Sequence, residues 1–249
     1  MPPETRINTP FAPALDLPPG FRLVTLREVG DAFAHARANA SSLGAGTLVF
    51  VGRFDLAEFA VVLEPDEPLR IARRAFYAGM AALTDALIAR APPEKPVTCV
   101  WPGAIHVDHG LVGGAQLAWS DGPEDEPPQW LVFGGMVRTV SMADGEPGLR
   151  PLSTAIEDEG FDEAGATELA GSFARHLMVQ IDAWQEFGFQ EIARTYLSRL
   201  APEAGLRRDI DDNGDLLVRR AGKPDTERHP LVAALATSDW LDPATRGPR

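Results

Sequence analysis

One helical pattern, between residues 66 and 91, constrains the fold more than any other feature of this sequence. It ends before Pro92 and Pro93, and its apolar residues recur every three or four positions, at Leu69, Ala72, Phe76, Met80, Leu83 and Leu87. This spacing predicts an amphipathic helix, with Asp66 as its N-cap and Pro68 in its first turn. Because strand-like apolar runs lie on both sides of it, the chain is predicted to be α+β, a mixed sheet backed by helices.

The strands are predicted from short runs rich in β-branched and aromatic residues. A strand over 21–26 and a short helix over 28–40 come first, and further strands are expected at residues 47–52, 58–63, 97–101, 105–107, 111–119 and 129–140. A second long helix is expected after Asp162 and a shorter one after Gly188. From the positions of these elements we predict a main domain over residues 21–200. It follows an extended proline-rich arm over residues 1–20.

Residues 201–249 have a different pattern and are predicted to form a small C-terminal β-module, a reduced barrel. The runs LRRDID and DLLVRR flank Asn213-Gly214, a dipeptide typical of a tight hairpin turn. The stretch from Asp209 to Gly214 also resembles the start of a calcium loop, but Arg220 stands where that loop needs a bidentate Glu. We therefore predict a hairpin there and no calcium site.

The charge balance argues against several classes of function. The chain has 23 Lys and Arg against 36 Asp and Glu, a net charge of −13, which disfavours nucleic acid as a partner. No segment has the pattern of a signal peptide or a membrane span, so we expect a cytoplasmic protein with no membrane contact. The single cysteine, Cys99, cannot form an internal disulfide and lies in an apolar strand, where a core role is favoured over a nucleophile.

Motifs for common chemistries are missing, and two clusters stay open. No dinucleotide fingerprint, P-loop or nucleophile elbow is present. His106, Asp108 and His109 could contribute to a metal site, although a surface turn is the favoured interpretation. Gly113 and Gly114 interrupt a predicted strand, which indicates either a ligand or backbone lying directly against it, or a bulge.

Several motifs, taken in order, resemble the biotin and lipoate protein ligase family. The run from Val100 to Val107, followed by Leu111 to Leu117, resembles the family's KWPND motif and the GKK(I/L)(A/G)GI strand after it. Residues 46–51, 61–66 and 211–219 resemble its GTVVVA strand, its LVLRP strand and its GIDEDGALLV hairpin. The resemblance covers roughly residues 20–220 and implies a ligase-like catalytic-domain fold with a small C-terminal β-module.

By that resemblance, the ligands would be a biotin- or lipoate-type acyl group, ATP with Mg²⁺, and a carrier protein whose lysine accepts the acyl group. The residues that serve ATP in the family differ here: Val100 and Leu111 stand in place of lysines, and Gly103-Ala104 replace an Asn-Asp pair. The connection over 53–55 is too short for the loop that covers the adenylate. A divergent ligase or acyltransferase and a non-catalytic module that binds a small ligand or a carrier protein are therefore two open alternatives.

Candidate ligand-binding residues follow from their positions in the resemblance. Arg53 would bind a ligand carboxylate bidentately and Asp55 would orient it, or the two form an exposed ion pair at a turn. The other candidates lie on or next to predicted strands: Trp101, Pro102, Gly113, Gly114, Gln116 and Arg138. We expect Gly113 and Gly114 to line a pocket beneath Trp101, and we assign no catalytic residue and no metal ligand.

Overall fold

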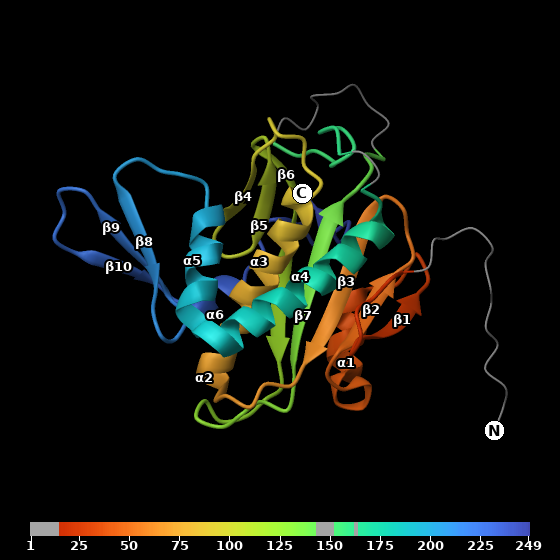
Figure 1. Ribbon diagram of the computed structural model, residues 1–249, viewed down its shortest axis with the longest axis horizontal. Helices are drawn as coiled ribbons and strands as arrows, with labels where there is room; N and C mark the ends of the chain where they lie inside the picture. Colours follow the sequence, from red (N-terminus) through yellow and green to blue (C-terminus); the bar gives the residue numbers. More distant parts are fainter. Residues whose placement is uncertain (1–14, 143–151, 162–163) are drawn as a thin grey trace.

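The fold is built around one seven-stranded sheet (Figure 1). A computed structural model describes residues 15–142, 152–161 and 164–249. The strand order is β1-β2-β3-β7-β6-β5-β4. β1 pairs with β2 in parallel, and the remaining neighbours in this order pair antiparallel. The sheet is therefore mixed, in agreement with the predicted α+β class.

The strands lie within a few residues of their predicted positions. They are β1 (Arg22–Leu26), β2 (Thr47–Val51), β3 (Leu56–Leu63), β4 (Val97–Val100), β5 (Ala104–Val107), β6 (Gly110–Trp119) and β7 (Leu131–Arg138). The central strands β2, β3 and β7 are buried along nearly their whole length. Their apolar runs are continuous because helices cover both faces of the sheet.

Alternate residues of β2, β3 and β7 contribute to two separate apolar clusters, one on each face. Helix α1 (Ala32–Leu43) packs on one face, and Asp31 caps it by accepting a hydrogen bond from the Ala34 nitrogen at 2.8 Å. The helices α3 (Ala75–Ile88), α4 (Ala166–Phe187) and α5 (Phe189–Arg199) pack together on the other face. The rings of Phe133 and Phe173 stack there between β7 and α4.

The long helix predicted from Asp66 is in fact divided in two. A short helix, α2 (Leu69–Ala72), precedes α3, and Pro68 rather than Asp66 occupies its N-cap position. At the junction, the guanidinium of Arg73 donates two hydrogen bonds to Glu124, both of 2.6 Å. The sequence did not reveal this break because Leu69, Ala72 and Phe76 keep the spacing of one helix across it, although the α2 residues belong to a separate apolar cluster.

The C-terminal residues first form a small sheet of their own. It contains β8 (Leu206–Ile210), β9 (Leu216–Arg220) and β10 (Thr226–His229), all antiparallel. In the predicted hairpin turn, Asp211 accepts hydrogen bonds from the nitrogens of Asn213 and Asp215, and Gly214 has a φ of 87°. The carboxylate of Asp211 therefore organises the turn itself.

The end of the chain returns to the large sheet. After α6 (Leu231–Leu235), the strands β11 (Leu241–Asp242) and β12 (Gly247–Pro248) form a short antiparallel ladder. β12 lies against β6 and β7. Residues 240–249 thus lie on the main sheet, although the sequence grouped them with the small module. Among the helices of the described ranges, none is both long and apolar enough to span a membrane.

Candidate functional site

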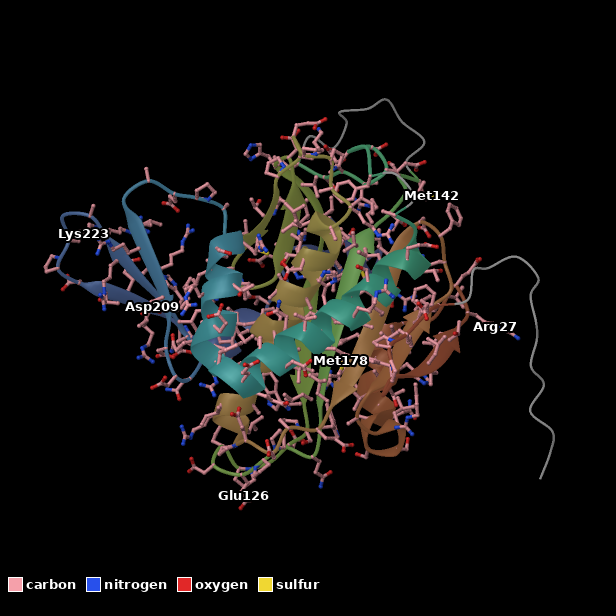
Figure 2. The ribbon with its side chains drawn as sticks, viewed as in Figure 1. Arg27, Glu126, Met142, Met178, Asp209 and Lys223 are labelled. Carbon is pink, nitrogen blue, oxygen red and sulfur yellow. The ribbon has the colours of Figure 1, made fainter. Side chains whose placement is uncertain are left out.

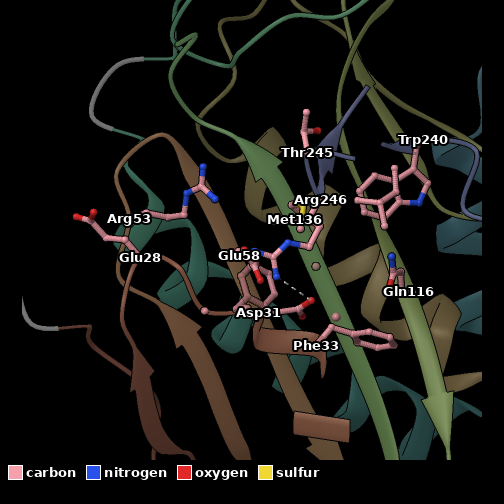
Figure 3. Close-up of a pocket in the computed structure, with 15 residues that line it drawn as sticks. Glu28, Asp31, Phe33, Arg53, Glu58, Gln116, Met136, Trp240, Thr245 and Arg246 are labelled. Carbon is pink, nitrogen blue, oxygen red and sulfur yellow. Dashed lines mark ion pairs between the residues drawn. The ribbon is translucent and has the colours of Figure 1, made fainter. Parts of the chain in front are cut away.

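A pocket opens on the α1 face of the sheet, between the start of α1 and the C-terminal end of the chain (Figure 3). Its volume is about 110 Å³. Four parts of the chain form its walls: the β1–α1 connection, the β2–β3 connection, the strands β3, β6 and β7, and residues 240–246. Among the side chains that line it are Glu28, Asp31, Phe33, Arg53, Glu58, Gln116, Met136, Trp240, Thr245 and Arg246.

Residues from three neighbouring strands form the floor of the pocket. Met136 on β7 is paired with Glu58 on β3 and with Gly114 on β6. One pair further along, Gly134 on β7 is paired with Gln116 on β6. Because side chains alternate between the two faces of a sheet, these residues share the face that carries α1. The floor thus combines the side chains of Glu58, Gln116 and Met136 with Gly134, and Gly114 lies next to them beneath the Trp240 ring.

Aromatic rings cover the two glycines of the floor. A Cβ on Gly134 would lie 2.5 Å from Cδ2 of Phe33, and a Cβ on Gly114 would lie 2.5 Å from two carbons of the Trp240 indole. Real Cβ atoms do not approach other atoms so closely, so both rings depend on the glycines beneath them. Phe33 belongs to α1 and Trp240 to the C-terminal end of the chain, on either side of the pocket (Figure 3).

Glu58 is the buried carboxylate of the pocket, with a relative exposure of 5%. Its Oε1 accepts a hydrogen bond of 2.8 Å from the backbone nitrogen of Ala32, at the first turn of α1. Burial raises the pKa of Glu58, and the nearby Asp31 also raises it, whereas the bond from Ala32 lowers it. A ligand that donates a hydrogen bond to Glu58 would offset the cost of keeping this carboxylate away from water.

Arg53 and Asp55 lie next to each other and form an ion pair. The Nε and Nη2 atoms of Arg53 donate to the two carboxylate oxygens of Asp55 at 2.8 and 2.6 Å. These bonds lower the pKa of Asp55 and raise that of Arg53. Phe54, between them, is 63% exposed and does not enter the sheet. Arg53 therefore lines the pocket with two of its nitrogens already bound to Asp55.

Trp101 and Pro102 lie away from this pocket. The indole nitrogen of Trp101 donates to the Tyr77 hydroxyl at 3.2 Å, and the carbonyl of Pro102 accepts a hydrogen bond from the Tyr196 hydroxyl at 2.7 Å. Both tyrosines belong to helices of the opposite face. The expectation that Gly113 and Gly114 lie beneath Trp101 is thus corrected, because Trp240 is the ring that covers Gly114.

Gly113 and Arg138 have structural contacts in the described chain. A Cβ on Gly113 would lie 2.0 Å from the carbonyl oxygen of Met136, so this glycine lets β6 and β7 approach closely. Arg138, at the end of β7, donates to the Ser153 hydroxyl and to the carbonyl oxygen of Pro248. The side chain of Arg138 therefore attaches the end of the chain to the sheet.

Of the other candidates from the sequence, Asp108 and His109 are exposed, His106 lies on β5 and Cys99 is buried. Asp108 and His109 both have positive φ, in the turn between β5 and β6, and Asp108 accepts a hydrogen bond of 2.8 Å from Lys95. In the described ranges, no three His, Cys, Asp or Glu side chains converge as metal ligands. Cys99 is buried in β4, and burial raises the pKa of its thiol to about 12.

A second hollow, of about 700 Å³, lies beside α2, where α4 ends and α5 begins. Arg74 crosses it, with its guanidinium 5.6 Å from the Trp184 ring and 4.4 Å from the Phe189 ring. Burial lowers the pKa of Arg74, and the carboxylate of Glu67, 3.5 Å away, opposes this. Several carboxylates line this hollow beside Arg74, which already has its partners within the protein. The pocket with Glu58 is the better candidate site because Arg53 and Gln116, both candidates from the sequence, line it.

Sequence reasoning missed most of the side chains around this pocket. Glu58 was recognisable as a lone charge in an apolar strand, LAEFAVVL. Trp240 and Arg246 carried no signal, because nothing in residues 236–249 indicates where that segment packs.

Comparison with known proteins gives the family. The model of the biotin/lipoate A/B protein ligase family matches residues 17–198. The chain belongs to this family. The match includes every strand of the large sheet and all helices from α1 to α4, so it covers the elements that build the floor and the α1 side of the pocket.

Solved structures of biotin protein ligases share the fold of this family member. A biotin protein ligase-like protein of unknown function from Silicibacter sp. TM1040 is 27% identical, with a TM-score of 0.76 over 90% of this chain and 100% of that chain. Biotin protein ligase from Aquifex aeolicus, in complex with biotin and ATP, is 13% identical, with a TM-score of 0.59 over 84% and 98%. The Leishmania major enzyme with biotinyl-5-AMP is 18% identical, with a TM-score of 0.53 over 85% and 98%. A search of curated proteins finds no match.

The pocket residues of this family member do not fit a nucleoside triphosphate. Glu28, Asp31 and Glu58 line the pocket, and Arg53 is already paired with Asp55. The two lysines of the chain lie elsewhere: Lys95 binds Asp108 and Glu159, and Lys223 lies at the outer tip of the small sheet (Figure 2). A polyphosphate placed at these described residues would face three carboxylates, against which the pocket offers Arg53, bound to Asp55, and Arg246, 4.0 Å from Asp31.

Proposed function

We propose that this protein is a non-catalytic binding member of the biotin/lipoate A/B protein ligase family, which holds a small biotin- or lipoate-type acyl ligand. The observation that carries the proposal is the pocket on the α1 face, with Glu58 and Gln116 on a floor of glycine-containing strands. Ligand sites typically combine apolar walls with a few convergent polar groups. Here Phe33, Met136 and Trp240 supply apolar surface, and Glu58 and Gln116 are the polar groups of the floor, beside further charged side chains in the walls.

The side chains indicate how such a ligand would lie. Phe33 and Met136 offer apolar surface to an acyl chain, and Glu58 and Gln116 offer hydrogen bonds to a polar head group. A ligand carboxylate would be repelled by the buried Glu58 and would therefore lie toward the Arg53 side. Family membership supports the acyl class of ligand, and the family's structures in complex with biotin are consistent with it.

The alternative, a divergent ligase or acyltransferase, needs groups that stabilise negative charge on a phosphorus in the transition state. Losing one such donor typically costs about 3 kcal/mol of transition-state stabilisation. The described pocket offers Arg53, bound to Asp55, and Arg246, whose side chain is 62% exposed. Binding without adenylation is the function that this arrangement supports better.

Calorimetric titration with biotin, lipoate and octanoate tests the proposal. We expect saturable binding of at least one of them, weakened about fivefold by Gln116→Ala, because one hydrogen bond is worth about 1 kcal/mol. The matched control is Gln190→Ala on the exposed side of α5, which should leave affinity unchanged. Failure of all three ligands to bind below about 1 mM, or binding insensitive to Gln116→Ala, would contradict the proposal.

A further inference from the structure

The C-terminal segment, defined as residues 240–249, contacts the α1 face of the sheet at several points. The indole of Trp240 rests on Gly114, and Trp240 has a relative exposure of 6%. Arg138 donates a hydrogen bond to the carbonyl oxygen of Pro248. The nitrogen of Arg249 donates to the carbonyl oxygen of Trp240 at 2.9 Å, which closes the segment on itself. The segment is therefore a folded part of this face.

Its internal hydrogen bonds give the segment a defined shape. Leu241 pairs with Pro248 in the short ladder, and Asp242 accepts hydrogen bonds from the Ala244 nitrogen at 2.9 Å and the Thr245 hydroxyl at 3.1 Å. These bonds close a turn, from which Arg246 extends toward Asp31, 4.0 Å away at the other side of the pocket (Figure 3). The segment thus reaches across the pocket from β6 to the start of α1.

With the C-terminal segment in place, the volume of the pocket limits the size of the ligand that can enter. Pockets for drug-sized ligands have volumes of about 300–1,000 Å³. This pocket has about 110 Å³ with the segment in place. The closed pocket can hold a small polar group but not a bicyclic ring with an acyl chain.

We propose that the C-terminal segment is the movable fourth wall of the ligand site, and that Trp240 determines the size of the ligand it accepts. This inference rests on the proposed function, because it concerns the same pocket. A larger ligand binds only when the indole leaves Gly114, so the segment and the ligand compete for one place on the sheet. The affinity for a biotin-sized molecule is then reduced by the fraction of molecules that are closed.

Thiol labelling tests, without any ligand, whether the C-terminal segment restricts access to the pocket floor. The chain has one natural cysteine, Cys99, which is buried, so Gln116→Cys places one reactive thiol on the pocket floor. We expect iodoacetamide to alkylate position 116 at least ten times faster when Trp240→Ala is added, and also when the chain is ended after Thr237. Ser198→Cys on exposed α5 is the control, and its rate should not change.

Two results would overturn the proposal. One is an unchanged labelling rate at position 116 in both altered chains. The other is a parallel rise at Cys99 in both, because exposure of a thiol buried in β4 would mean that the segment maintains the fold rather than closing the site. Peptide mapping by mass spectrometry separates the two thiols in one sample.

Titration with biotin then separates this inference from the proposed function. With Gln116 intact, Trp240→Ala should bind biotin at least ten times more tightly than the unaltered chain. Equal affinity of the two chains for biotin would contradict the proposal that Trp240 limits the size of the ligand. If biotin binds neither chain while labelling at position 116 still accelerates, the closure of the pocket by the C-terminal segment is supported and the proposed acyl ligand is wrong.

Discussion

The carboxylate of Glu58 and the backbone nitrogen of Ala32 are 2.8 Å apart and joined by a hydrogen bond. This bond links the middle of the sheet to the first turn of α1, and the same carboxylate lines the pocket (Figure 3). A helix N-terminus favours negative charge, whereas burial disfavours it. Burial is the larger effect here, since the pKa of Glu58 is raised.

Glu58→Gln should stabilise the protein at neutral pH, because it removes the buried charge and keeps an oxygen for Ala32. With a raised native pKa, the stability that protonated Glu58 contributes is complete below the ordinary value of 4.5 and is lost as pH rises through the native pKa. We expect the variant to gain on the order of 1 kcal/mol at pH 7 and nothing at pH 4. Urea unfolding at several pH values measures this difference.

The matched control for this experiment is Glu28→Gln, which alters an exposed carboxylate at the same pocket. Its free energy of unfolding should equal that of the unaltered chain at both pH values. A gain from Glu58→Gln that is the same at pH 4 and pH 7 would show that the charge of Glu58 is not its cause.

The ion pair of Arg53 and Asp55 should show measurable coupling. The pair is half-buried, so we expect a double-mutant cycle with Arg53→Ala and Asp55→Ala to give about 1 kcal/mol at pH 7. Because Arg53 lowers the pKa of Asp55, this stability is present above the ordinary value of 3.8 and is lost as pH falls through the native pKa. Urea unfolding at pH 7 and pH 3 compares the two conditions.

A second ion pair, Arg194 with Glu191 on α5, serves as the control because it is exposed and its residues are three apart on one helix. The same cycle there should give no measurable coupling. If the Arg53 cycle also gives none at pH 7, the ion pair at the β2–β3 connection does not contribute measurably to stability.

The close contact between Gly134 and Phe33 predicts a specific rescue. Gly134→Ala should cost about 1–3 kcal/mol, because the added Cβ would lie 2.5 Å from the ring. Adding Phe33→Ala should remove more than half of that cost, since only its Cβ, 3.2 Å away, stays close. Thermal and urea unfolding of the single and double variants measure the coupling.

Gly135 provides the control for this pair, because it faces the opposite side of β7. There an added Cβ would lie 2.8 Å from the Phe59 ring and 3.2 Å from Leu83. Phe33→Ala should give Gly135→Ala no relief. Equal relief at both glycines would mean that Phe33→Ala loosens the whole sheet.

Much of the architecture could be predicted from local patterns in the sequence. Apolar runs gave the strands of the sheet, and helical spacing gave α3, α4 and α5. The break before α3 could not be predicted, because the apolar residues of α2 and α3 keep the spacing of one helix. The motif order indicated the family, which the match over residues 17–198 confirms.

The site itself depends on contacts between distant segments, and these leave little trace in a single sequence. Gly113 and Gly114 indicated either a group lying directly against β6 or a bulge, and the pairing of β5 with β6 does shift its register next to Gly113. The structure places the Met136 carbonyl against Gly113 and the Trp240 ring against Gly114. Neither partner could be identified without the fold, because the glycines show only that space is required.

The last prediction concerns nucleotide binding. We expect Mg²⁺·ATP to bind with a Kd well above about 10 μM, which corresponds to about 7 kcal/mol, because Glu28, Asp31 and Glu58 line the pocket and Arg53 is bound to Asp55. Calorimetry, with and without biotin, measures this, and the Aquifex aeolicus ligase is a positive control because its structure holds biotin and ATP. A Kd at or below about 10 μM, together with pyrophosphate release, would restore the ligase alternative, with Arg53 leaving Asp55 to meet the phosphates.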